Sequence, residues 1–106
     1  MTVESRTALD TLPSTIVHVT DYAQAVKEFL NTEGWIQGQF HNEFGYCLAG
    51  AMDEVSRRNN VSEKTVWSAV LAIQDKIGLK SLANWNDYQG RTKEEVLDML
   101  ASISNG

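Results

Sequence analysis

The residues of this chain that could do chemistry gather in two aromatic and polar segments, Gly34–Gly45 and Lys80–Arg91. Segments that place large aromatic side chains beside polar groups are either docked tightly on a core or built to bind. We expect two structured loops, packed at one end of the domain, that form a shared site. The candidate ligand-binding or partner-binding residues are Trp35, Gln37, Phe40, His41, Trp85, Asn86, Asp87, Tyr88 and Arg91.

Cys47 is the first candidate for catalysis, because a lone cysteine with a histidine such as His41 nearby is typical of thiol nucleophiles. Its spacing favours another role. Cys47, Ala51 and Val55 share one apolar helix face, where an unpaired thiol behaves as a small hydrophobe. A single cysteine also excludes an internal disulfide and a multi-cysteine zinc site. We therefore predict no catalytic residue.

Metal and phosphate chemistry lack the spacing they need. A metal site would draw on His18, His41, Cys47, Asp53 or Glu54, yet no His-x-x-x-His, Cys-x-x-Cys or alternating Asp loop occurs. No glycine-rich loop is followed by Lys and then Ser or Thr, the pattern that cradles phosphates. We expect no metal and no cofactor, and we favour a non-enzymatic function.

The second loop has two interpretations. In the structural one, Trp85 fills the core, while Asp87 accepts loop N–H groups or pairs with Arg91. In the functional one, Trp85 and Tyr88 are anchors and Arg91 is a directional donor, since Trp, Tyr and Arg dominate binding hot spots. The pattern leaves both open, and the partner of Arg91 distinguishes them.

The first loop lies between two expected helices. One begins with Thr20 or Asp21 as its cap and ends at Gly34 in a left-handed conformation. The next runs from about 46 to 58, where Asn59 and Asn60 end it, and it carries two outward ion pairs, Asp53–Arg57 and Glu54–Arg58. Before the first helix, the β-branched segment 14–19 is expected to be either a short edge strand or an extended arm.

Two further helices flank the second loop. Ser62 caps one and Gly78 closes it. Thr92 and Glu95 begin the other with a capping box, in which each side chain satisfies the other residue's free backbone N–H. The expected inner faces are Val66, Ala69, Val70, Ile73 and Ile77, widened by Trp67 and Leu71, and then Val96, Leu97, Leu100 and Ile103.

Length and composition fit one domain. The chain has 106 residues, of which 42% are hydrophobic and 22% charged. We expect an all-α, single-domain bundle of about four helices over residues 15–106, with a flexible N-terminus at 1–14. No apolar run approaches the roughly 18 residues that span a bilayer, and no signal-peptide pattern opens the chain. A cytoplasmic protein without a membrane partner is the resulting expectation.

Charge is distributed unevenly along the chain. Residues 1–54 carry eight acidic and two basic side chains, for a net charge of −6, whereas residues 55–106 carry six acidic and seven basic, for +1. Phosphate contacts need clustered Lys and Arg, so this balance argues against direct nucleic-acid binding. The acidic first half favours a partner with a basic surface.

Three sequence blocks carry a resemblance. They are Gly34-Trp35-x-Gln37-Gly38, then Cys47-Leu48-x-Gly50-Ala51, then Trp85-Asn86-Asp87 with Gly90-Arg91-Thr92-x-x-Glu95-Val96. Together they resemble a family of small uncharacterised proteins of actinobacteria, other bacteria and their phages, over about residues 22–103. The chain departs at Ile36, where members of that family often have Cys. The resemblance implies a shared helical fold and an origin in bacteria or phages, and it brings no activity.

Three functional hypotheses follow. The first is a non-enzymatic protein-binding module, such as a phage- or bacterium-encoded inhibitor or adaptor, acting in the bacterial or host cytoplasm through Trp35, Phe40, Trp85, Tyr88 and Arg91. The second is a small-ligand binder or minor enzyme with a pocket between the two loops. The third is a homo-oligomer whose apolar arm pairs across a two-fold axis.

Overall fold

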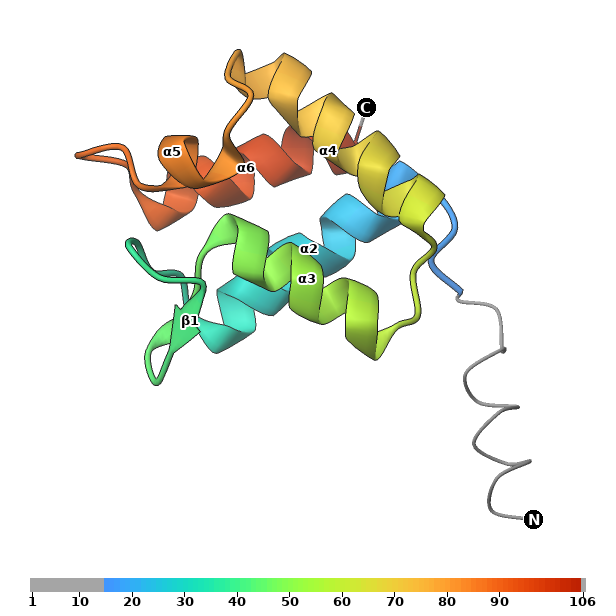
Figure 1. The fold of residues 1–106 in the computed structure, drawn as a ribbon, viewed down its shortest axis with the longest axis horizontal. Coiled ribbons are helices and arrows are strands. Elements are labelled where there is room, and N and C mark those ends of the chain that lie inside the picture. The colour runs from blue at the N-terminus through green and yellow to red at the C-terminus, as the bar shows by residue number, and fades with distance from the viewer. Residues whose placement is uncertain (1–14, 106) are drawn as a thin grey trace.

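The computed structural model describes residues 15–105, and within them the chain is an all-α fold with one small hairpin (Figure 1). The long helices are α2 (Val19–Glu33), α3 (Leu48–Arg58), α4 (Glu63–Ile77) and α6 (Lys93–Ser104), and α5 (Leu82–Asn86) is a short one. β1 (His41–Asn42) and β2 (Gly45–Tyr46) pair antiparallel, with His41 opposite Tyr46. The predicted fold class is confirmed, with α5 as an additional helix.

Helix α2 is the centre of the domain. It contacts α3, α4 and α6, and its contact with α6 is the most extensive of the fold. Tyr22, Ala23, Val26 and Leu30 recur along its buried side, so one apolar stripe meets three neighbours. The rest of the core comes from the helices around it: Leu48, Ala51, Met52, Val55, Ala69, Ile73, Trp85, Val96, Met99 and Leu100.

Local signals fixed most helix ends. Ser62 caps α4, Gly78 closes it in the left-handed conformation, and Thr92 with Glu95 forms the predicted capping box. The two ion pairs on α3 are also present. Each of these features needs only residues within one helical turn, which explains why the sequence predicted them.

Several predicted boundaries are wrong. Helix α2 begins at Val19, its N-cap is His18 without a side-chain bond, and neither Thr20 nor Asp21 caps it. Helix α3 begins after Cys47 rather than at Tyr46. The predicted end at Gly34 is confirmed, but Gly34 has φ 101° and ψ 152°, a positive-φ conformation that glycine adopts readily, rather than the left-handed helical conformation.

The segment before α2 contains no strand in its described part, residues 15–18. Ile16 and Val19 pack against the core, and the Thr65 hydroxyl donates to the Val17 carbonyl over 3.2 Å. This part of the predicted arm therefore lies along the helical body. Ser14 and the predicted flexible N-terminus lie outside the described residues.

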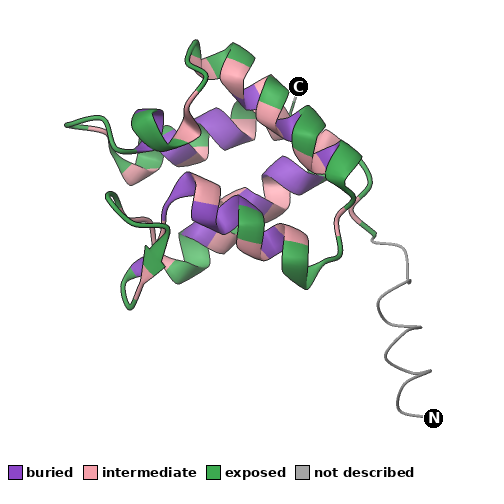
Figure 2. Cartoon of the chain, in the orientation of Figure 1, coloured by how far each residue is buried: buried purple, intermediate pink, exposed green. Residues whose placement is uncertain are grey.

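Trp67 and Leu71 of α4 are exposed, contrary to the prediction. Both were expected to widen the buried face of α4, yet they are 64% and 61% exposed. The buried residues of α4 are Thr65 and the predicted Ala69 and Ile73 (Figure 2), and the predicted Val66, Val70 and Ile77 are partly buried against the core. At about 100° per residue, Trp67 and Leu71 lie on the opposite side of the helix, so the apolar pattern of α4 is wider than its neighbours can cover.

Neither predicted loop is a simple loop. The hairpin occupies the second part of the first loop, and a parallel bridge between Trp35 and Tyr46 joins its start to its end. Helix α5 occupies the middle of the second, capped by the Ser81 hydroxyl. None of the helices described here is long and apolar enough to cross a membrane.

Candidate functional site

Asn86 lies where the two aromatic segments meet, and its side chain is fully buried. Its Oδ1 accepts hydrogen bonds from the Trp35 indole over 2.6 Å and from the Leu48 backbone N–H over 3.0 Å. Its Nδ2 donates to the Ile36 carbonyl over 3.1 Å and to Asp87 Oδ1 over 2.9 Å. A buried amide with both ends satisfied fixes its neighbours in one arrangement.

Two more side chains extend this network to the surface. Gln37 Nε2 donates to the Asn86 and Tyr88 carbonyls, each over 3.0 Å. Asp87 Oδ1 accepts the backbone N–H of Gly38 over 3.0 Å. We call Trp35, Gln37, Asn86 and Asp87 the loop clasp, because they join the segment before the hairpin to the segment around α5.

Gly50 lets the first turn of α3 lie against the backbone of Phe40, just before β1. A Cβ on this glycine would lie 2.1 Å from the Phe40 backbone oxygen, which itself accepts the Cys47 N–H over 3.0 Å. Gly34 and Gly45 approach each other equally closely, since a Cβ on either would lie within 2.4 Å of the other segment's backbone. These close contacts require glycine for space.

Arg91 does not pair with Asp87. Its Nε donates to the Trp85 carbonyl over 2.9 Å, and its guanidinium lies 4.0 Å from the centroid of the Trp85 ring. The Tyr88 ring is 5.5 Å away, and Glu95 Oε1 lies 3.7 Å from Nη1. Arg91 thus covers a tryptophan that is itself buried in the core, as the structural interpretation of this loop expects for Trp85.

Cys47 is buried as predicted, but as a helix cap. Its Sγ accepts the backbone N–H of Gly50 over 3.3 Å at the start of α3. His41 lies on the hairpin, where its ring is 5.5 Å from the ring of Tyr46 rather than paired with the thiol. The structure does not bring together a cysteine–histidine couple among its described residues.

The remaining candidate residues are exposed. Phe40 and Tyr88 are 67% and 66% exposed, although their backbones are tied to the clasp and to α3. Phe44, in the turn of the hairpin, is exposed as well. The predicted site therefore divides into two sets. Trp35, Gln37, Asn86, Asp87, Trp85 and Arg91 hold the two segments together, and Phe40, His41 and Tyr88 are exposed on them.

The pocket expected between the two segments is small. It has a volume of about 160 Å³ and is lined by Gly38, Gln39, Phe40, Cys47, Ala83 and Asp87. Ligand pockets for drug-sized molecules are generally about 300–1,000 Å³. This space fits a single side chain of a partner better than a small-molecule substrate.

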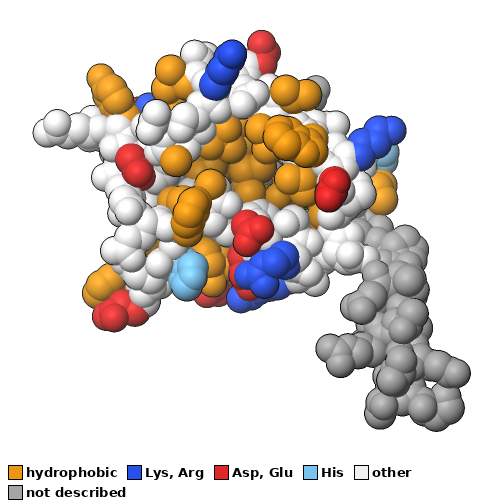
Figure 3. All heavy atoms as spheres, viewed as in Figure 1, with side chains coloured by type: hydrophobic (Ala, Val, Ile, Leu, Met, Phe, Trp, Pro, Cys, Tyr) orange, Lys and Arg blue, Asp and Glu red, His pale blue; other side chains and the backbone are white. Residues whose placement is uncertain are grey.

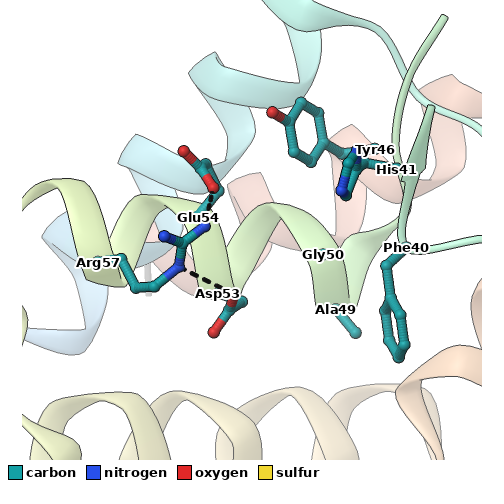
Figure 4. A pocket seen from close by; sticks show the side chains of 8 residues that line it. All are labelled: Phe40, His41, Tyr46, Ala49, Gly50, Asp53, Glu54 and Arg57. Atoms are coloured by element: carbon teal, nitrogen blue, oxygen red, sulfur yellow. Dashed lines mark hydrogen bonds and ion pairs between the residues drawn. The ribbon is translucent and has the colours of Figure 1, made fainter. Parts of the chain in front are cut away.

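A larger hollow of about 480 Å³ lies between the hairpin and α3 (Figure 4). Phe40, His41 and Tyr46 form its hairpin side, and Ala49, Gly50, Asp53, Glu54 and Arg57 form its α3 side. Of these residues, only Phe40 and His41 were among the predicted site residues. Of the residues that were missed, Tyr46 lies on β2 and the others belong to α3, whose charged side chains look like ordinary ion pairs.

The charges of this hollow are largely paired. Arg57 bridges Asp53 and Glu54, and Arg58 Nε donates to Glu54 over 2.6 Å. The hydrogen bond from Arg58 holds the pKa of Glu54 below its ordinary value of 4.5, against partial desolvation, and the nearby positive charges add to the effect. Helix α3 therefore neutralises two of the acids that make the first half of the sequence acidic.

Residues 15–105 contain no group of three or more His, Cys, Asp and Glu side chains that could hold a metal ion. Buried polar side chains are also accounted for, since none of those described lacks a hydrogen-bond partner. On the surface, the aromatic side chains of Phe40, Phe44, Trp67 and Tyr88 are exposed.

Comparison with protein families gives one match. The model of a family of unknown function, DUF6197, matches residues 15–104, which is nearly the whole described chain. A search of curated proteins and a search of solved structures both find no match.

Proposed function

This chain belongs to DUF6197, a family of unknown function, and we propose that it is a non-enzymatic protein-binding module. The binding surface we propose is the loop end, defined as residues 36–40 and 87–91 with Phe40 and Tyr88 as its exposed aromatic side chains. The observation that carries the proposal is the position of these two residues on segments held by a buried network. Exposed aromatic residues are typical anchors of protein interfaces.

Rigidity supports this proposal. Gln37 bonds to the carbonyl of Tyr88, and Asp87 bonds to the N–H of Gly38, so the two segments of the loop end hold each other. A surface that is ordered before binding loses less conformational entropy when its partner arrives. The clasp therefore favours binding even though its central side chain, Asn86, is buried.

The chemistry beside Phe40 suggests the kind of partner. Phe40 and Asp87 line the same small pocket, which combines an apolar wall with a carboxylate. A protruding Lys or Arg side chain of the partner fits this combination, because its stem packs on the ring and its charge approaches the acid. Asp53 and Glu54 contribute less to such attraction, since Arg57 and Arg58 already pair with them.

A more specific form of this proposal is that the chain is an inhibitor or adaptor, encoded by a bacterium or its phage, that acts in the cytoplasm. Its support is the resemblance of the three sequence blocks described above, together with the small size of the domain. An inhibitor of this kind needs one rigid surface and no catalytic group, which is what we propose for the loop end.

A photo-crosslinking amino acid placed at Phe40 or at Tyr88 tests the proposal in bacterial cells. We expect the same protein to be crosslinked from both positions and not from Glu28, an exposed residue of α2. With that partner purified, Phe40→Ala and Tyr88→Ala should each weaken binding at least about tenfold, as expected for interface anchors. Equal crosslinking of that partner from Glu28, or unchanged affinity of both variants at an unchanged melting temperature, would overturn the proposal.

A second candidate function is small-ligand binding in the hollow between the hairpin and α3. Its volume of about 480 Å³ and its mixture of aromatic walls with His41 and Asp53 favour this function. Thermal-shift screening of a metabolite set against the chain and against Ala49→Phe, which fills the hollow, tests it. A ligand that raises the melting temperature of the chain alone supports this function. No such ligand, or an equal rise in both proteins, counts against it.

A further inference from the structure

The outer face of α4 is apolar and uncovered. Trp67 and Leu71 are one helical turn apart and mostly exposed, on the side opposite Thr65, Ala69 and Ile73. Figure 3 shows hydrophobic side chains gathered over α4 and beside it toward α3. An exposed Trp–Leu pair on one helix face is unusual for a solvated surface, and contiguous apolar patches mark interaction sites.

Opposite charges lie at the two ends of this face. Lys64 is five residues before the midpoint of Trp67 and Leu71, and Asp75 is six residues after it. At about 1.5 Å per residue the two charged side chains are nearly equidistant from that midpoint. Both are exposed, and neither makes a hydrogen bond or an ion pair with any other residue of the part of the chain described here.

We propose that the outer face of α4 binds the same face of a second copy of this chain, with the two α4 helices antiparallel about a two-fold axis. In that arrangement Lys64 of each copy lies opposite Asp75 of the other, and Trp67 packs against Leu71 across the axis. A two-fold interface must be complementary to itself, and a face with opposite charges at equal distances from an apolar centre meets that requirement. The small side chain of Ser68 lets the helices approach.

The small size of this interface predicts weak association. Helix α4 has 15 residues, so it is about 22 Å long, and a single helix pair covers an area at the low end of specific interfaces. The dimer is therefore expected to depend on concentration. Its exposed charge pairs are screened by salt, so high ionic strength should weaken it.

This pairing uses a surface other than the loop end. The loop end lies at Phe40 and Tyr88, whereas the α4 face is formed by Lys64, Trp67, Leu71 and Asp75. Tyr88→Ala should therefore leave self-association unchanged. Failure of one proposal leaves the other standing.

Sedimentation equilibrium of the full chain at low salt, over a wide concentration range, tests the pairing. We expect reversible dimerisation, lost in Trp67→Ala. The single variants Lys64→Asp and Asp75→Lys each place like charges opposite one another twice per dimer and should weaken dimerisation at least about tenfold. The double variant K64D/D75K reverses both charges and should restore dimerisation to within about threefold.

Lys76→Asp is the matched control, because it makes the same charge change on an exposed residue of α4 outside the pairing face. Far-UV circular dichroism confirms that each variant is folded. A chain that is monomeric at every concentration overturns the proposal and leaves the face to a different protein. Weakening by Lys76→Asp as strong as by Lys64→Asp, or no restoration in the double variant, also overturns it.

Discussion

The loop clasp and the outer face of α4 both contain tryptophan, yet they are opposite in character. Trp35 donates its indole N–H to Asn86, and Trp85 lies in the core beneath Arg91. Trp67 has its ring in solvent. The role of each tryptophan in this chain therefore depends on its polar partners and on the neighbours that cover it.

The loop clasp and the outer face of α4 should contribute differently to stability and to binding. In the clasp every polar group of the Asn86 side chain is paired, so a substitution there leaves buried groups without partners. On α4, removing the side chain of Trp67 or Leu71 should hardly change the free energy of unfolding of the isolated domain, because both side chains already contact water. The clasp should therefore determine folding, and the α4 face should determine association.

Asn86→Ala should have the largest effect. The substitution removes the partner of the Trp35 N–H, the Leu48 N–H and the Ile36 carbonyl in a buried site. We expect the free energy of unfolding to fall by on the order of 3–4 kcal/mol, measured by urea denaturation. The control is Asn84→Ala on the exposed side of the same short helix, where the expected change is below about 0.5 kcal/mol. Equal losses in the two variants would mean that the hydrogen bonds of the buried Asn86 side chain do not stabilise the fold.

Gly50→Ala tests the close approach of α3 to the hairpin. The new Cβ would collide with the Phe40 backbone oxygen, which cannot rotate away as a side chain would. We expect a loss of about 2–3 kcal/mol in the free energy of unfolding, from overpacking. Ala49→Gly, in the same helical turn, should cost only about 1 kcal/mol through helix propensity. A smaller loss for Gly50→Ala than for Ala49→Gly would show that the segments can separate without cost.

Tyr22 is a buried polar residue outside the clasp, and its contribution to stability can be measured through its pKa. Burial raises its pKa to about 12, from the ordinary value of 10.0, and its hydroxyl donates to the Met52 carbonyl over 2.7 Å. The folded state keeps the proton that the unfolded chain releases, so this contribution is fully present below pH 10 and is lost as the pH rises to about 12.

Urea denaturation of the chain and of Tyr22→Phe at pH 9 and pH 11 measures that contribution. The free energy of unfolding of the chain should fall more than that of the variant, by on the order of 1 kcal/mol at pH 11. All other side chains are the same in the two proteins, so the difference between them isolates Tyr22. Parallel losses would mean that the Tyr22 hydroxyl reaches water in the folded state.

Trp67→Ala should have the smallest effect on the isolated domain. We expect a change below about 0.5 kcal/mol in the free energy of unfolding at dilute concentration, because the ring is already solvated. Ala69→Asp, on the buried side of the same helix, is the contrasting variant and should prevent stable folding. A loss of more than about 1 kcal/mol for Trp67→Ala would place the ring against the core and remove the contrast between the two regions.

The sequence predicted several features that depend only on near neighbours. Ser62, Gly78 and the Thr92–Glu95 capping box fix helix ends through bonds within one turn, and the ion pairs of α3 join residues one turn apart. It also predicted that the two aromatic segments meet. These features follow from helix geometry and local hydrogen bonding, which need no knowledge of the remaining chain.

The roles of individual residues depended on the tertiary structure. Asn86 and Trp35 are 51 residues apart, and no local pattern could pair them. Trp67 shares the periodicity of its helix, but which side of an apolar helix is covered depends on where α2 and α6 lie. Burial and hydrogen bonding between distant segments are collective properties, so only the folded chain determined which aromatic residues hold it together and which face outward.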